Sequence, residues 1–141
     1  MRRILLLGLV LLTLFVLACS RSGDAGPAAA SPVLPAETLA SGTTSPGDVL
    51  LELTPRRLEG GQLDVEVQAN THSVDLAQFD LTELSTLKSQ GKSFKPLAAS
   101  SLSGHHSTGQ LSFPVEGDLQ GFRIVIRGVP LAETRVYEWE G

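Results

Sequence analysis

An unbroken alternation of apolar and polar residues between positions 63 and 69 constrains the fold more than any other feature. The apolar set is Leu63, Val65, Val67 and Ala69, and the polar set is Asp64, Glu66 and Gln68. Such alternation is typical of a strand with one face in the core and one in water, as in antiparallel sheets. Asp64 and Glu66 are therefore expected on the solvated face.

Similar patterns recur along the rest of the chain. The predicted strands cover residues 49–54, 63–69, 75–80, 84–88, 93–97, 108–115, 122–127 and 135–139. Pro55 is expected to end the first, and Gly60-Gly61 and Gln90-Gly91-Lys92 predict turns. Residues 82–88 also fit one helical turn capped by Thr82 or Asp80. Residues 98–107 are expected to form a polar loop.

Short strands without a long helical pattern predict an all-β fold. Seven or eight of them in residues 47–141 indicate an immunoglobulin-like antiparallel β-sandwich. In the last strand, Tyr137 and Trp139 are expected inward, because burying two aromatic rings contributes more than burying Val136. Cys19 is the only cysteine, so no internal disulfide forms.

The first 18 residues have the parts of an export signal. Arg2 and Arg3 precede an apolar run that ends at Leu17 and is shorter than the ~20 residues of a membrane span. The run closes with Val16-Leu17-Ala18-Cys19, which resembles the lipobox of bacterial lipoproteins. That resemblance implies cleavage before Cys19, acylation of Cys19 and a lipid anchor on the exported side of a bacterial membrane. The alternative is a plain secretory signal cut after Ala18, which leaves a free thiol.

Residues 19–46 predict a flexible linker. They are rich in Ala, Ser, Gly, Thr and Pro and lack an apolar period, so ordering them gains little burial. A short helix over residues 36–40 is an alternative. Removal of residues 1–18 leaves 9 basic and 15 acidic residues, a formal charge of −6. This balance argues against nucleic acid and anionic lipid as direct partners.

The mature domain also resembles a group of small exported bacterial β domains. The likeness lies in Thr71-His72-Ser73-Val74-Asp75-Leu76, Gly104-His105-His106 with Gly109-Gln110-Leu111-Ser112-Phe113-Pro114, and Arg135-Val136-Tyr137-Glu138-Trp139. The resemblance supports the β fold and implies no particular activity.

The three histidines form the one candidate metal site. If strand 63–69 pairs with strand 110–115, then His72, His105 and His106 lie at the same end of the sandwich, and Asp75 is a possible fourth ligand. Three imidazoles suit Zn²⁺ or Cu²⁺. The alternative is structural, with solvated His105 and His106 and with His72 bonded to turn backbone.

Other chemistry has weaker support. His72 and Asp75 match two parts of a hydrolase triad, but the sequence has no Gly-x-Ser-x-Gly motif, and a small sandwich offers little room for a cleft. The pair Arg123 and Arg127 is able to meet an anion or to remain a solvated face. We therefore expect a non-enzymatic envelope lipoprotein that binds a protein partner or supports an assembly. The alternative is a metal-binding envelope domain.

Overall fold

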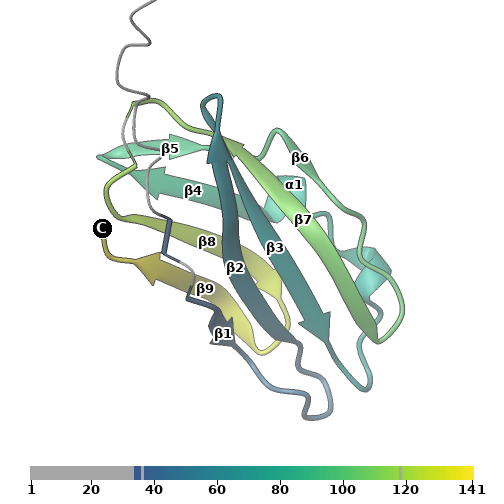
Figure 1. Cartoon of the computed structure of the whole chain (residues 1–141). Coiled ribbons are helices and arrows are strands. Elements are labelled where there is room, and N and C mark those ends of the chain that lie inside the picture. The colour runs from purple at the N-terminus through teal and green to yellow at the C-terminus, as the bar shows by residue number, and fades with distance from the viewer. Residues whose placement is uncertain (1–33, 36, 118) are drawn as a thin grey trace, which may run out of the picture.

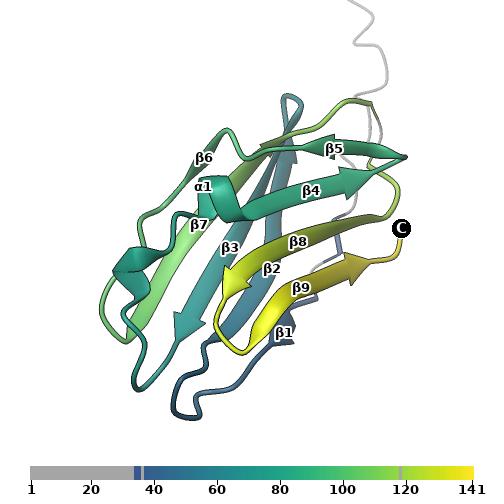
Figure 2. The same cartoon turned by 180° about the vertical axis from the view of Figure 1, so that it is seen from behind.

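The computed structural model describes residues 34, 35, 37–117 and 119–141. The predicted signal, Cys19 and most of the predicted linker lie outside these residues. Two antiparallel sheets pack face to face (Figures 1 and 2). The strands are β1 (Leu39–Ser41), β2 (Leu50–Glu59), β3 (Gln62–Asn70), β4 (Ser85–Ser89), β5 (Lys92–Phe94), β6 (Ala98–Ala99), β7 (His106–Pro114), β8 (Phe122–Val129) and β9 (Ala132–Trp139). Within the described ranges, no helix has the length and apolar character needed to cross a membrane.

The strand order confirms the predicted fold class. One sheet has the order β1-β2-β3-β7-β6, and the other has the order β5-β4-β8-β9. With β2 as strand A, β3 as B and β4 as C, the sheets read A-B-E-D and C′-C-F-G, as in immunoglobulin-like sandwiches. The described residues form nine strands: seven of the eight predicted ones, together with the short edge strands β1 and β6.

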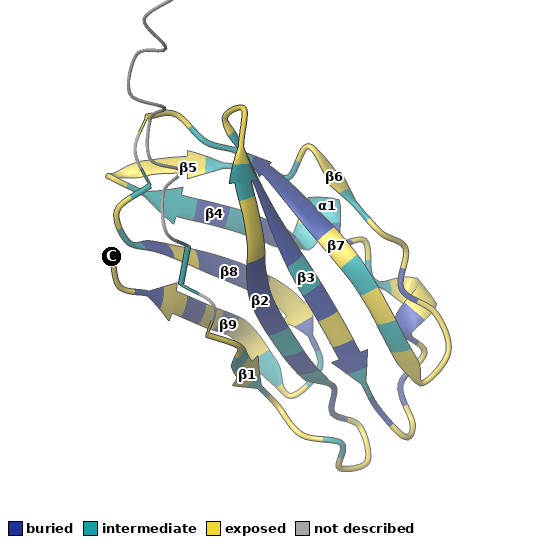
Figure 3. Cartoon of the chain, viewed as in Figure 1, coloured by how far each residue is buried: buried dark blue, intermediate teal, exposed yellow. Residues whose placement is uncertain are grey.

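The core follows the predicted alternation. Figure 3 shows buried and exposed residues alternating along the strands. Fully buried side chains come from the facing sides of both sheets, including Leu51, Leu53, Leu63, Val65, Val67, Leu87, Leu111, Phe113, Ile124 and Ile126. Tyr137 and Trp139 are buried and Val136 is exposed, which confirms the predicted face of β9. Burial raises the pKa of Tyr137 to about 12, so its hydroxyl remains a donor and bonds the carbonyl of Leu51 at 3.3 Å.

The folded domain begins earlier than predicted. Residues 39–41 were assigned to the flexible linker, but they pair with β2 in the register Leu39↔Leu53 to Ser41↔Leu51. Leu39 packs against the core, and the hydroxyls of Thr38 and Thr54 bond at 2.7 Å. Composition did not predict this strand, because its contacts are mostly backbone pairing and it buries only part of one leucine.

Four other predictions need correction. Pro55 does not end the strand, since β2 continues through a register shift between Pro55 and Arg57, where a bulge accommodates proline. Residues 76–78 form a 3₁₀ helix, η1 (Leu76–Gln78), instead of a strand, because Asp75 caps Ala77 N–H at 3.0 Å. The helical alternative for residues 82–88 holds only at its start, since α1 (Leu81–Leu84), capped by Asp80, gives way to β4 at Ser85. Residues 98–107 are not wholly a loop, since β6 and the start of β7 lie within them. Asp64, expected in solvent, is buried.

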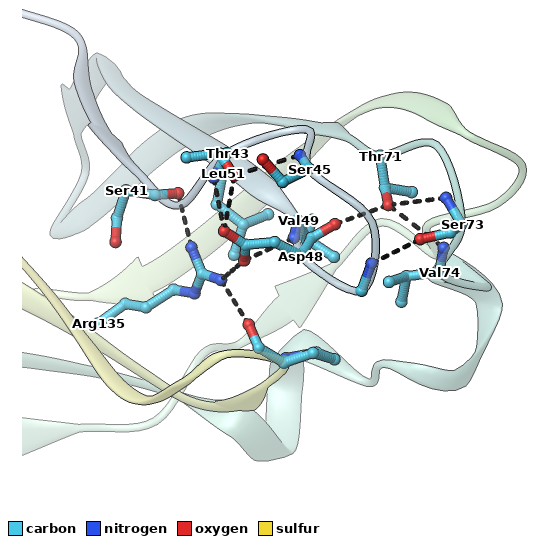
Figure 4. Close-up of polar contacts among 12 residues, drawn as sticks. Ser41, Thr43, Ser45, Asp48, Val49, Leu51, Thr71, Ser73, Val74 and Arg135 are labelled. Atoms are coloured by element: carbon cyan, nitrogen blue, oxygen red, sulfur yellow. Dashed lines mark hydrogen bonds and ion pairs between the residues drawn. The ribbon is translucent and has the colours of Figure 1, made fainter.

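A buried ion pair joins the two sheets at one edge. Arg135 on β9 is 2% exposed, and its Nη2 lies 2.9 Å from Oδ1 of Asp48 (Figure 4). The same guanidinium donates to the carbonyls of Ser41 at 2.6 Å and Pro130 at 2.8 Å. One side chain therefore links the loop between β1 and β2, residues 42–49, to the turn between β8 and β9.

Asp48 is held as a carboxylate in this network. Burial alone would raise its pKa, but hydrogen bonds from the N–H groups of Val49 and Thr43, from Arg135 and from the Thr43 hydroxyl lower it below 3.8. The negative charge is thus favoured where the guanidinium needs it.

The two ends of the sandwich differ. At the end of β9, Nε1 of Trp139 donates to the carbonyl of Glu37 at 2.9 Å, so the chain enters the domain there. We call this the tether end. The turn between β8 and β9 lies at the other end of the strand, about 24 Å away at ~3.4 Å per residue. We call that the distal end.

We expect Asp48→Ala to lower the free energy of unfolding by about 3–5 kcal/mol, because it leaves a buried guanidinium without its counter-charge. Urea denaturation of the variant and the wild type at pH 7 measures this difference. Glu66→Ala is the control: it removes a more exposed pair with Arg56 and should cost about 1 kcal/mol or less.

The difference also depends on pH. Because the pKa of Asp48 is lowered on folding, its contribution is complete above 3.8 and is lost as the pH falls through the folded-state value. The difference in the free energy of unfolding between the wild type and Asp48→Ala should therefore become smaller below about pH 4. A gap that widens on acidification would contradict the ion-pair account.

Candidate functional site

Hydrogen bonds between backbone groups and side-chain hydroxyls join the loops at the distal end. Thr71, just after β3, donates to the carbonyl of Asp48 at 2.7 Å and accepts from the N–H groups of Ser73 and Val74. Ser73 in turn accepts from Gly47 N–H at 2.7 Å (Figure 4). These contacts give Thr71 and Ser73 structural roles in fixing the loop that carries Asp48.

The predicted gathering of the histidine-bearing loops is confirmed. β3 pairs antiparallel with β7, which places Asn70 opposite His106, and Thr71 N–H bonds the carbonyl of His105 at 2.9 Å. The rings of His72 and His106 lie edge to face with centroids 6.4 Å apart. Nδ1 of His106 is 2.8 Å from Oδ1 of Asn70. All three histidines are exposed.

These contacts do not assemble the three-histidine site. Among the residues that the structure describes, no group of three or more His, Cys, Asp or Glu is placed to hold a metal ion. Asp75, the proposed fourth ligand, instead caps η1. Zn²⁺ or Cu²⁺ binding by His72, His105 and His106 stays a prediction that this arrangement does not favour.

A surface hollow of about 530 Å³ lies beside the β4–β5 turn at the tether end. It is larger than we expected for so small a sandwich. Its lining includes Lys88, Lys92, Arg123, Glu138 and Glu140, so charges of both signs surround it. None of the three histidines lines it, and its two serines therefore have no imidazole base beside them.

Most charged side chains on the outer face of the larger sheet are paired with one another. Arg57 bonds Asp64 at 2.6 Å, and Asp64 also accepts from Gln62 and Ser112, each at 2.7 Å. Burial alone would raise the pKa of Asp64, but these hydrogen bonds lower it below its ordinary value. Sequence alternation placed Asp64 outward correctly but missed this burial, which comes from neighbouring side chains on the same face.

The outer face of the smaller sheet is different. Lys88, Arg123 and Arg127 point outward, because their neighbours Leu87, Ile124 and Ile126 are in the core. Lys88 and Arg123 lie opposite each other in the β4–β8 register. Within the described part of the chain, none of the three makes an ion pair or a hydrogen bond between side chains.

This contrast defines a candidate surface. Each of the other basic side chains in the described ranges contacts a carboxylate or, for Lys95, the carbonyl of Glu83. Val136 is 53% exposed and pairs across the sheet with Val125. Glu138 lies on the same outer face as the cross-strand neighbour of Arg123. We call Lys88, Arg123, Arg127, Val125 and Val136 the basic face.

The sequence identified Arg123 and Arg127 as one face of a strand, but missed Lys88 and Val136. Lys88 could have been found from its place beside the core residue Leu87. The exposure of Val136 follows from the predicted burial of Tyr137 and Trp139. What no pattern revealed is that these cations lack partners, since that depends on side chains from other strands.

We expect Arg123→Ser with Arg127→Ser to change the free energy of unfolding by less than about 0.5 kcal/mol, because neither side chain has a partner to lose. Thermal and urea unfolding of the double variant measure this. A loss above about 2 kcal/mol would mean that the two arginines stabilise the fold.

Comparisons with known proteins found no relative. No protein-family model matches the chain, and no curated protein or solved structure matches it significantly. The resemblances of residues 16–19 to a lipobox and of the domain motifs to small exported β domains therefore stay predictions. The function has to be argued from the residues and their geometry.

Proposed function

We propose that this chain is a lipid-anchored binding protein of a bacterial cell envelope, without enzymatic activity. Its sandwich domain contacts an acidic protein partner through the basic face. The observation that carries the proposal is the excess of positive charge on the outer face of the smaller sheet, where Lys88, Arg123 and Arg127 make no ion pair. On the described strands of that face the one carboxylate is Glu138, opposite Arg123. The anchor is supported by the lipobox-like residues 16–19.

The basic face lies on a protein whose overall charge is negative. After cleavage before Cys19 the chain carries 9 basic and 15 acidic residues. A cationic patch on an acidic protein steers association toward a surface with the opposite charge and disfavours wrong partners. Three cations are too few for the phosphate contacts that sustain nucleic-acid binding. The basic face therefore fits an acidic protein surface best.

The position of the chain entry supports the same function. The backbone at Glu37 lies against Trp139 at the tether end, and about 18 residues separate Cys19 from Glu37. At that length, the flexible linker that the sequence predicts would span roughly 20–25 Å. The domain can thus remain near the membrane while its sheet face and distal loops contact a neighbouring protein.

Mass spectrometry of the intact protein from its native host tests the anchor. We expect the mature chain to begin at Cys19 and to carry a diacylglyceryl group and an amino-terminal acyl chain. Cys19→Ser should abolish the added mass and release the domain from membranes, because stable anchoring needs more than one acyl chain. An unmodified thiol on a chain cut after Ala18 would contradict the anchor.

Cross-linking in native membranes tests the basic face. Arg123→Glu with Arg127→Glu should reduce the yield of adducts between the domain and its partner by about tenfold, because like charges then face the acidic surface. The matched control is Arg56→Glu with Lys95→Glu, which makes the same charge change elsewhere on the domain. Equal adduct yields for both double variants would contradict a role for the basic face.

A further inference from the structure

The turn between β8 and β9 has an unusual residue at its second position. Val129 pairs with Ala132, so Pro130 and Leu131 alone form the turn. Proline holds φ near −65°, which excludes the turn types usual in two-residue hairpins, since both need a positive φ at the first position. Leu131 has φ +61°. The turn is therefore of type II, whose second central position favours glycine or asparagine.

The other tight hairpins of the described residues place glycine or a polar residue where φ is positive. Gly60 and Gly61 join β2 to β3, and Gly91 lies in the turn from β4 to β5. In the described ranges only Gln90 and Leu131 have positive φ without being glycine, and Gln90 is polar. Leu131 is 75% exposed. A bulky apolar side chain here gains neither burial nor a relaxed backbone.

The buried ion pair holds this turn in place. Nη2 of Arg135 donates to the carbonyl of Pro130 at 2.8 Å while also contacting Asp48 at 2.9 Å (Figure 4). Local strain persists only where the surrounding structure enforces it, and such positions concentrate at functional sites. The contacts of Arg135 thus support a turn that displays a leucine to solvent.

We propose that Leu131 is the apolar anchor of the binding surface and inserts into an apolar pocket bordered by carboxylates on the partner protein. This inference rests on the proposed function and extends the basic face to the distal end. Arg127 lies two residues before Val129, at the end of β8 nearest the turn, so a partner surface that receives Leu131 and extends over β8 would meet this cation. The exposed Glu133 lies beside the turn as well. Arg135 is a positioning residue for Leu131.

Other occupants fit less well. Leu131 lies at the end of the domain opposite the chain entry at Glu37, so the anchor does not hold it against the membrane. A second copy that used the same surface would bring an excess of positive charge against an excess of positive charge. Like charges facing each other disfavour that arrangement.

A photo-crosslinking amino acid placed at position 131 of the full lipidated chain, in native membranes, tests the anchor. We expect one discrete adduct, mapped by mass spectrometry to an apolar residue of the partner flanked by Asp or Glu. The matched control is position 97, where Leu97 is 60% exposed, and it should give no such adduct. Adducts with lipid or with a second copy, or equal adducts from both positions, would overturn the proposal.

Leu131→Asn separates function from structure. Asparagine tolerates positive φ, so the melting temperature should rise by about 2–5 °C. With a photo-crosslinking residue at position 136 of the same variant, the yield of the partner adduct should fall at least fivefold. A lower melting temperature, or an unchanged adduct, would overturn the role of Leu131. If this variant leaves the adduct unchanged while Arg123→Glu with Arg127→Glu removes it, the proposed function stands and only the anchor fails.

Discussion

The guanidinium of Arg135 is the contact on which the arrangement of this domain depends. It is buried on β9, and it joins the carboxylate of Asp48 to the carbonyls of Ser41 and Pro130. A buried charge is costly unless it is paired and hydrogen-bonded, so these partners have to be held in place. Thr71 contributes by bonding the carbonyl of Asp48. The network fixes the first strand, the distal loops and the β8–β9 turn relative to one another.

The same network separates structural polar residues from those available to a partner. Four polar residues make their hydrogen bonds inside the domain: Arg135, Asp48, Thr71 and Ser73. Most charged side chains on the outer face of the larger sheet are paired with one another. On the smaller sheet, the cations of the basic face have no such partners in the described ranges. A domain that satisfies most of its charges internally thus keeps one face for intermolecular contact.

Sequence periodicity was sufficient for seven of the nine strands in the described residues and for most of their inward residues, because alternation directly reports which face meets the core. Periodicity was not sufficient to predict the burial of Arg135. This residue shares the inward face of Tyr137 and Trp139 but carries a charge. Its partner Asp48 is 87 residues away and follows a segment whose composition suggested a linker. Antiparallel pairing of β3 with β7 predicted the meeting of the histidine loops, but not the directions of their rings. The strained backbone of Leu131 follows a proline, and no periodic pattern indicates it.

Hydrogen exchange of Arg135→Lys tests the central claim most directly. Lysine keeps the charge but lacks the planar fork that reaches Asp48, Ser41 and Pro130 together. If this fork ties the domain together, amide protection should fall both in β1 and in residues 129–132, while β3 and β7 keep theirs. Unchanged protection in either segment, or a uniform loss across all strands, would contradict the account.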